Sequence, residues 1–391
     1  MPYFCLGEME DKMKKIFTSL LMMLMLIVSQ VLPTAALSYD ESYTSAKGYY
    51  SQKTSFNSFS ELYAYEAIGL DSSDYSIDHL ISTDYASEIA QSVIALSLHG
   101  DNPKNYNGVN YVEMLENCVQ SNGAFDKKNN STYANFQVYG VFALYVVDSP
   151  KLSLAADYLT SLIDDNGAFG SSYGPSLDIT SWVIESLSLV DKDKYQPTIQ
   201  RAIVYLQSMR DGQAGYKDSF SGVNVNTQAS VMTGLLTYDA KGVKAGTYNQ
   251  NGYNPYDVLL KYQNTDGSFW YSTPGEVNDY ATIQGIQTIG YYYNESVYQK
   301  AKQDYLALDE VIDTEKQPEI EVKPEVEVEQ EVEKTETSSS QSQKQPQKEV
   351  VTETTKQKDV VQTDDQSWLF EYGLLFMGSG ILLLKGRKYF E

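Results

Sequence analysis

The chain has 391 residues with 52 acidic and 29 basic side chains, which gives a formal net charge of −23. Such an excess of negative charge excludes nucleic acid as a partner, because the surface would repel a polyanion. Only two cysteines, Cys5 and Cys118, are present, so a disulfide framework is excluded as well. An exported domain without disulfides suits a bacterium better than an animal extracellular space.

The beginning of the chain predicts an export signal. Lys14 and Lys15 follow Met13, and an apolar run covers residues 16–31. Small residues around Ala36 offer a cleavage site, so residues 1–38 are predicted to be a secretory signal peptide. Residues 1–12 are acidic, unlike the basic start of a signal, which leaves Met13 as an alternative start. An uncleaved signal anchor is the other alternative.

An internal repeat dominates residues 39–308. Four turn motifs join a glycine to an aromatic residue a few positions later, and their glycines are 44, 45 and 55 residues apart. The longest interval contains the stretch 241–254, which is rich in Gly, Asn and Tyr and is predicted to be a loop insertion. The motif residues are Gly123 with Phe125, Gly167 with Phe169, Gly212 with Tyr216, and Gly267 with Phe269.

Each turn lies between two helical patterns. Apolar spacing predicts helices over 111–119, 154–163, 199–209 and 256–262 before the turns, and over 133–147, 179–190, 227–238 and 280–292 after them. An earlier pair at 56–70 and 85–98 lacks the glycine turn, and a last helix at 295–308 ends the array. The predicted N-caps of the second helices are Asp84, Thr132, Asp178, Asn226 and Asp279.

A glutamine precedes three of the turns, at Gln120, Gln207 and Gln263. A helix, this glutamine, an Asp/Asn-Gly turn with its aromatic residue and a second helix together resemble the QW-like repeat of the squalene cyclase and protein prenyltransferase β-subunit superfamily. The resemblance implies an all-α fold, an α/α toroid of helix-pair repeats of the terpenoid cyclase-like kind. An open solenoid of helix pairs is the alternative.

The residues that carry the chemistry of such relatives are missing. No Asp-x-Asp-Asp acid occurs, and Asp164-Asp165 lies in a turn. A zinc site needs three or four converging ligands, which His79, His99 and Cys118 do not provide. We therefore expect no metal, no cofactor and no catalytic residue.

If the toroid forms, the amino ends of its second helices gather at one mouth of a central cavity. Polar groups with aromatic residues around a concave centre are typical of a ligand site. This predicts a non-catalytic binding protein for a small-molecule or glycan-like ligand. The alternatives are a secreted carbohydrate- or terpenoid-active enzyme with Asp178 and Asp279 as paired carboxylates, or an adhesin. The predicted cavity-mouth residues are Asp84, Tyr85, Tyr133, Asn135, Asp178, Trp182, Asn226, Gln228, Asp279 and Tyr280.

The last part of the chain predicts a tether and a membrane anchor. Residues 309–366 hold 17 acidic and 7 basic side chains, 17 − 7 = 10 net negative charges, and are predicted to be a disordered linker. Within 367–391, an apolar run and a basic tail predict a transmembrane helix. They resemble a Gram-positive sortase sorting signal, although Asp364 replaces its glycine, so a sortase is only a further candidate partner. We expect a protein on the extracellular face of a Gram-positive bacterium, anchored to its plasma membrane or cell wall.

Overall fold

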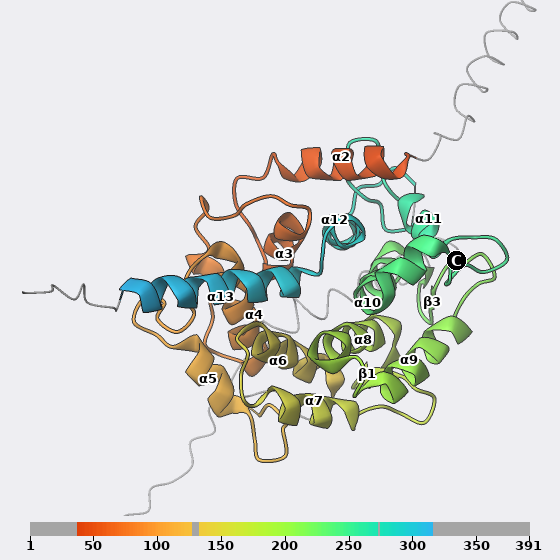
Figure 1. Ribbon diagram of the computed structural model, residues 1–391. Helices are drawn as coiled ribbons and strands as arrows, with labels where there is room; N and C mark the ends of the chain where they lie inside the picture. The colour runs from red at the N-terminus through yellow and green to blue at the C-terminus, as the bar shows by residue number, and fades with distance from the viewer. Residues whose placement is uncertain (1–36, 127–132, 273, 316–391) are drawn as a thin grey trace, which may run out of the picture. The chain divides into compact units, whose positions relative to one another are not determined.

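The computed structural model describes residues 37–126, 133–272 and 274–315 (Figure 1). The predicted signal peptide up to residue 36, the linker beyond Glu315 and the C-terminal membrane segment lie outside these residues. Within the described part of the chain, no helix combines the length and the hydropathy needed to cross a membrane.

The prediction of an all-α fold is confirmed, since the described residues form twelve α-helices with only two short hairpins. The predicted loop 241–254 is wrong in its first part, because α10 continues through a break at Asp239 to Ala245. The last helix also continues beyond 308. The elements are α2 (Tyr39–Tyr50), α3 (Phe59–Ala67), η1 (Asp78–Leu80), α4 (Ala86–His99), α5 (Tyr111–Cys118), α6 (Ala134–Val146), α7 (Leu152–Thr160), β1 (Phe169–Ser171), β2 (Gly174–Ser176), α8 (Leu177–Asp191), α9 (Gln196–Ser208), β3 (Lys217–Asp218), β4 (Gly222–Val223), α10 (Val225–Ala245), α11 (Pro255–Leu260), α12 (Asp279–Tyr293) and α13 (Val297–Glu315).

Six helices, which we call the inner helices, pack on one another in a cycle. In chain order α3 packs on α4, α4 on α6, α6 on α8, α8 on α10 and α10 on α12, and α12 then packs on α3 (Figure 1). The close approach of α8 and α10 uses Gly234, where an added Cβ would lie 2.7 Å from the carbonyl oxygen of Ser181. The contacts therefore return to the helix from which they start.

Five further helices, which we call the outer helices, pack on the inner ones. These are α5 on α4, α7 on α6, α9 on α8, α11 on α10 and α2 on α12. Helix α2 was not predicted, because its sequence is rich in Tyr and Ser and has no apolar stripe. A capping box starts it instead: the backbone N–H of Ser38 donates to Glu41 Oε2 at 2.9 Å, and the Ser38 side chain accepts from the Glu41 N–H.

The glycine turns connect four of the outer helices, α5, α7, α9 and α11, to the inner helix that follows each of them. Gly123, Gly167, Gly212 and Gly267 have φ values of +92°, +90°, +95° and +97°, which suit glycine alone. Three of them also touch the backbone of the following outer helix: Gly123 meets Leu154 of α7, Gly167 meets Arg201 of α9, and Gly267 meets Ser45 of α2. The last turn of the repeat therefore packs against the first described helix.

The aromatic residue of each turn is held by a buried polar side chain on the next inner helix. The backbone N–H of Phe125 donates to Gln137 Oε1 at 2.7 Å, and that of Tyr216 donates to Gln228 Oε1 at 3.0 Å. In the other two repeats a threonine replaces the glutamine. Phe169 N–H donates to Thr180 Oγ1 at 2.9 Å, and Phe269 N–H donates to Thr282 Oγ1 at 2.9 Å.

The predicted N-caps were displaced by one or two residues. Ser176, Asn224 and Asn278 cap α8, α10 and α12 by accepting backbone N–H groups of the first turn. Tyr85 precedes α4 and Tyr133 precedes α6, both without a side-chain capping bond, and Thr132 lies outside the described residues. Asp178, Asn226 and Asp279 therefore stand inside the first helical turn.

Replacing Gly267 by Ala should destabilise the fold more than the same change at Gly212. Both glycines have almost the same positive φ, so the backbone strain, about 1–2 kcal/mol, is shared. An added Cβ at Gly267 would overlap the backbone of Ser45, whereas at Gly212 the nearest atom is 4.0 Å away. Unfolding by denaturant should show the larger loss for Gly267→Ala. Equal losses would mean that the contact between the last turn and α2 is not tight.

Replacing Thr282 by Val should cost about 1–3 kcal/mol of unfolding free energy, because the buried N–H of Phe269 loses its acceptor while the shape is kept. Thr247 is exposed, so Thr247→Val is the matched control and should change stability by less than about 0.5 kcal/mol. Thermal and denaturant unfolding measure both variants. If Thr282→Val is as stable as the control, the hydrogen bond from the backbone N–H of Phe269 to Thr282 does not stabilise the fold.

Candidate functional site

The six inner helices surround a central space. Along each helix, the side chains that face this space are separated by four and then by three residues. On α8 these positions are Asp178, Trp182 and Glu185, and the same spacing recurs on α10 and α12. The equivalent residues are Asn226, Ser230 and Thr233 on α10, and Tyr280, Gln284 and Gln287 on α12.

A cavity of about 50 Å³ lies among these helices. In the same measure one water molecule needs about 10–15 Å³, so this space has room for about three to five waters. Its walls combine aromatic rings with hydroxyl and amide groups. The lining residues are Ser60, Tyr63, Tyr139, Trp182, Glu185, Ala229, Ser230, Thr233, Tyr280, Gln284, Gln287, Thr288 and Tyr298.

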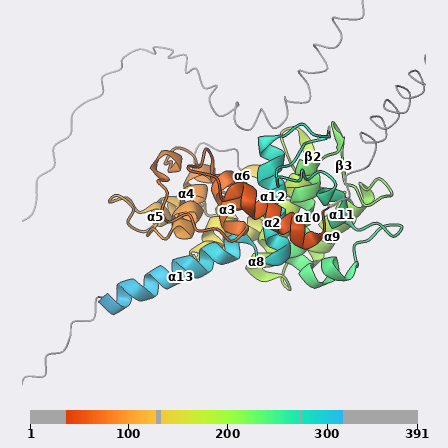
Figure 2. The same cartoon turned by 90° about the horizontal axis from the view of Figure 1, so that it is seen from above.

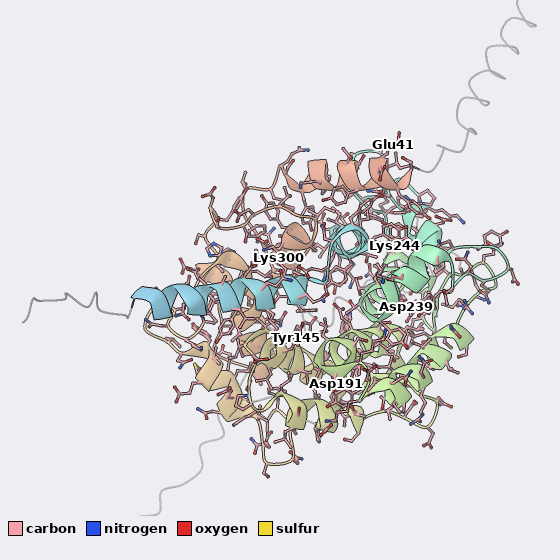
Figure 3. The ribbon with its side chains drawn as sticks, viewed as in Figure 1. Glu41, Tyr145, Asp191, Asp239, Lys244 and Lys300 are labelled. Carbon is pink, nitrogen blue, oxygen red and sulfur yellow. The ribbon has the colours of Figure 1, made fainter. Side chains whose placement is uncertain are left out.

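Helix α13 covers one end of the cavity. Its first residues are buried, and the ring of Tyr298 stacks on Phe142 of α6 at 3.8 Å between centroids. Lys300, labelled in Figure 3, holds the helix to α3 through an ion pair with Glu66 at 3.1 Å. Figure 2 shows α13 on one side of the inner helices and the strands β2 and β3 on the other. The hairpins therefore mark the end of the cavity that α13 does not cover.

Glu185 is the one acidic residue among the described residues that line the cavity. Its side chain is 2 % exposed, and its Oε1 accepts from Ser296 Oγ at 3.0 Å and from Thr237 Oγ1 at 3.5 Å. Burial raises the pKa of Glu185 to about 7, although hydrogen bonds from Tyr291, Ser296 and Thr237 oppose the shift. A carboxyl group that titrates near neutrality inside a cavity is a common feature of functional sites.

Four buried oxygen atoms on the inner helices have no hydrogen-bond partner among the described residues. They are Ser230 Oγ and Gln284 Oε1, whose residues line the cavity, and Asn135 Oδ1 and Asn226 Oδ1 one helical turn nearer the hairpins. A buried polar atom without a partner is costly, by about 1–3 kcal/mol. These atoms are therefore positioned to accept hydrogen bonds from something that enters the centre.

The structure brings only some of the predicted cavity-mouth residues to the cavity. Trp182 and Tyr280 line it, and Asn135 and Asn226 have the orphaned oxygens described above. Gln228 is fully buried and bonds the backbone of Tyr216 and Pro255. Gln228 therefore has a structural role, because it holds the backbone of the aromatic residue in the third glycine turn.

The predicted carboxylate pair is not brought together. Burial raises the pKa of Asp178 to about 6, with Thr227 and Asp218 as its neighbours. Asp279 is exposed, and its charge acts on Tyr49 and Tyr50, the last two residues of α2. The helix starts explain the difference, since Asp178 is the second residue of α8 and Asp279 is the first of α12. One position along a helix turns a side chain by about 100°.

The other predicted mouth residues lie at the edges of the helices. Asp84 is exposed, and its backbone N–H donates to Ser82 Oγ at 3.3 Å. Tyr85 and Tyr133 are the half-buried residues that precede α4 and α6. Sequence reasoning missed Glu185, Tyr139, Ser230 and Tyr298. The first three could have been found from their spacing along the chain. Tyr139 and Ser230 lie four residues after the second residue of their helices, and Glu185 lies seven residues after it.

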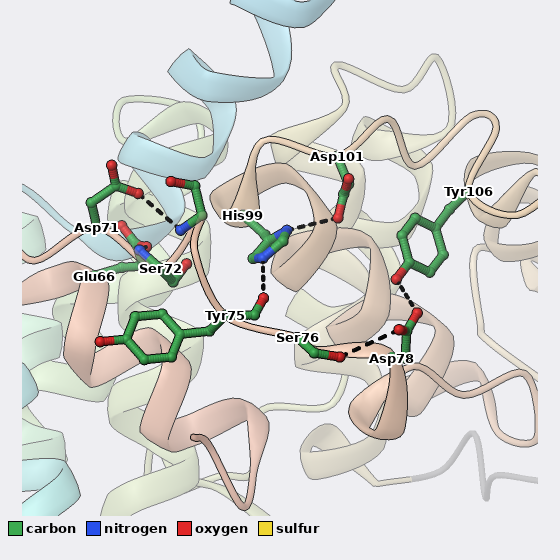
Figure 4. A network of polar contacts seen from close by, with 10 residues as sticks. Glu66, Asp71, Ser72, Tyr75, Ser76, Asp78, His99, Asp101 and Tyr106 are labelled. Atoms are coloured by element: carbon green, nitrogen blue, oxygen red, sulfur yellow. Dashed lines mark hydrogen bonds and ion pairs between the residues drawn. The ribbon is translucent and has the colours of Figure 1, made fainter. Parts of the chain in front are cut away.

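The histidines are used in loop contacts. His99 places Nδ1 2.7 Å from Asp101 Oδ2 and Nε2 2.7 Å from the carbonyl oxygen of Tyr75, so both ring nitrogens have partners (Figure 4). His79 Nε2 lies 2.7 Å from the carbonyl oxygen of Phe56, and the thiol of Cys118 donates to Met114 O at 3.2 Å. Over the described residues, no three His, Cys, Asp or Glu side chains converge as metal ligands would.

Comparison with known proteins adds no relative to this picture. No protein-family model matches the chain, and no curated protein matches it.

The raised pKa of Glu185 gives a pH test. In the unfolded chain this carboxyl titrates near 4.5, and in the folded protein near 7, so the folded state binds more protons between these values. Its contribution to the unfolding free energy therefore falls as the pH rises through this window. Glu185→Gln removes the titration, so the variant should gain about 2 kcal/mol relative to the wild type between pH 5 and pH 8. Denaturant unfolding at both pH values measures this, and a constant difference would contradict the assignment.

Proposed function

We propose that this chain is a cell-surface binding protein whose helical domain is an α/α toroid that holds a ligand in its centre. The cycle of inner helices, the outer helices packed on it and the recurring turns support the toroid. In this proposal the domain belongs to the repeat superfamily that the sequence resembles, and the predicted tether and membrane segment present it outside a Gram-positive cell.

The observation that carries the binding function is the set of orphaned polar atoms at the centre. A core that served packing alone would be more stable with apolar side chains at Ser230 and Gln284. Aromatic walls with a few polar groups are the usual composition of a small-molecule site. The cavity volume of about 50 Å³ restricts the ligand to a small molecule, or to one small group of a larger molecule, such as a substituent of a glycan, whose remainder lies outside.

A catalytic role for the same cavity is a second candidate, because a buried carboxyl with a pKa of about 7 could donate and accept a proton. Glu185, in place of Asp178 with Asp279, would then be the acid-base residue. The adhesin alternative draws on Tyr173 and Phe220, which are 67 % and 71 % exposed near the tips of the two hairpins. Conversion of the bound molecule would favour the enzyme. Binding to a surface protein that cavity substitutions leave unchanged would favour the adhesin.

Replacing Gln284 by Met should separate binding from stability. The change removes the orphaned oxygen at similar length, so the ligand-free protein should keep its unfolding free energy or gain about 1 kcal/mol. Ligand occupancy should fall about tenfold. Mass spectrometry of small molecules released from the purified full chain measures occupancy.

Val204 lies on outer helix α9 and is 63 % exposed, so Val204→Ala is the matched control and should retain the ligand. If the wild-type chain releases no small molecule, or if both variants retain it equally, the central site is not the binding site.

A further inference from the structure

We propose that the central cavity recognises a cation, namely the methylated ammonium group of a small molecule. The inference rests on the proposed binding function and adds the chemical class of the ligand. Three independent features of the cavity support it: the aromatic walls, the sign of its charge and its size.

Aromatic rings approach the cavity from five different helices. Tyr63 comes from α3, Tyr139 from α6, Trp182 from α8, Tyr280 from α12 and Tyr298 from α13. The rings of Tyr139 and Trp182 are 6.0 Å apart at 49°, and those of Tyr63 and Tyr298 are 6.2 Å apart at 71°. A space with aromatic rings on several sides favours a cation, because the face of each ring is electron-rich.

The charge of the cavity has the matching sign. Glu185 is its only ionisable group apart from tyrosines, and no Lys, Arg or His stands among the described residues that line it. The titratable groups that interact with Glu185 are Tyr291 of α12 and Tyr298 of α13. Tyr298 interacts in turn with Tyr139 of α6 and Tyr63 of α3. An ionised Glu185 therefore has no counter-charge from the described lining residues, and a bound cation would supply it.

The size of the cavity distinguishes an ammonium group from a sugar. Space for about three to five waters accommodates the few heavy atoms of a trimethylammonium group, whereas a hexose ring is larger. The orphaned Gln284 Oε1 and Ser230 Oγ can accept hydrogen bonds from a hydroxyl or amide attached to the cation. A methylated ammonium compound with one polar arm fits all of these groups.

The test compares choline with 3,3-dimethylbutan-1-ol, which has the same shape with carbon in place of the charged nitrogen. Isothermal titration calorimetry with the purified full chain at pH 8 should show choline binding about tenfold tighter than its neutral isostere. Glu185→Gln keeps an acceptor for Ser296 and removes the charge, so it should reduce this preference to about threefold or less. Val204→Ala should bind as the wild type does.

Two further measurements test the charge and the rings separately. Choline affinity should fall in the wild type between pH 8 and pH 5.5, as Glu185 takes up its proton, and should stay constant in Glu185→Gln. Trp182→Leu removes one aromatic wall, so it should weaken choline more than it weakens the neutral isostere. This variant tests the proposal even if Glu185→Gln fails to fold.

The outcomes separate the ligand class from the binding function. Equal affinity for choline and its isostere would overturn the cation proposal and leave a cavity that binds by shape. The same holds if neither probe binds while the purified chain releases another, neutral molecule. If neither probe binds and no molecule is released, both the cation proposal and the proposed function fail.

Discussion

The contact between the last glycine turn and the first described helix joins the two ends of the repeat and places an outer helix on α12. Three of the four turn glycines reach the next outer helix by having no side chain, and at Gly267 the neighbour is α2. Two more bonds join the same segments: Ser42 Oγ donates to Gln263 Oε1, and Gln263 Nε2 donates to Ser42 O at 3.0 Å. These residues are 221 positions apart, so the contact links the two ends of the repeat. Without it α12 would lose the outer helix that covers it, and the inner cycle would be closed only by the packing of α12 on α3.

The closed cycle of inner helices also explains why the centre of the domain is polar. Each inner helix packs on two inner neighbours, and five of the six also pack on an outer helix. The six helices form a cycle, so the faces that they do not use in these contacts surround a central space. Side chains fill this space only in part. Helix α13 packs Tyr298 into one end, through Phe142 and Tyr63. The other end retains the residues of the first helical turns, whose polar side chains lie near the hairpins.

The sequence was sufficient for the features that repeat locally. Apolar spacing predicted most helices, and a glycine followed by an aromatic residue predicted the turns, because each depends on residues close in the chain. Helix α2 was missed because its contacts with α12 and the Gly267 turn come from residues far along the chain. The N-caps were missed by one or two positions because Ser, Asn and Asp occur together at each helix start, and any of them can cap. That small error decided the site, since it placed Asp178 and Asp279 on one face when they lie on different ones.

Glu185 shows why a buried acid is hard to find from sequence and informative once found. The Oε1 atom of Glu185 accepts hydrogen bonds from Ser296 and Thr237. A glutamine at this position could accept the same hydrogen bonds without the cost of a buried charge. The structural contacts therefore account for an acceptor at this position and do not account for its ability to ionise. Desolvation raises the pKa of Glu185 to about 7, so near neutrality the group is poised between its two states and a nearby charge would decide between them. Tyrosine rings surround it, and these can stabilise a cation but carry no positive charge of their own. A cation bound beside Glu185, as we propose, would favour the ionised carboxylate, and this is an advantage that a glutamine at the same position would lack.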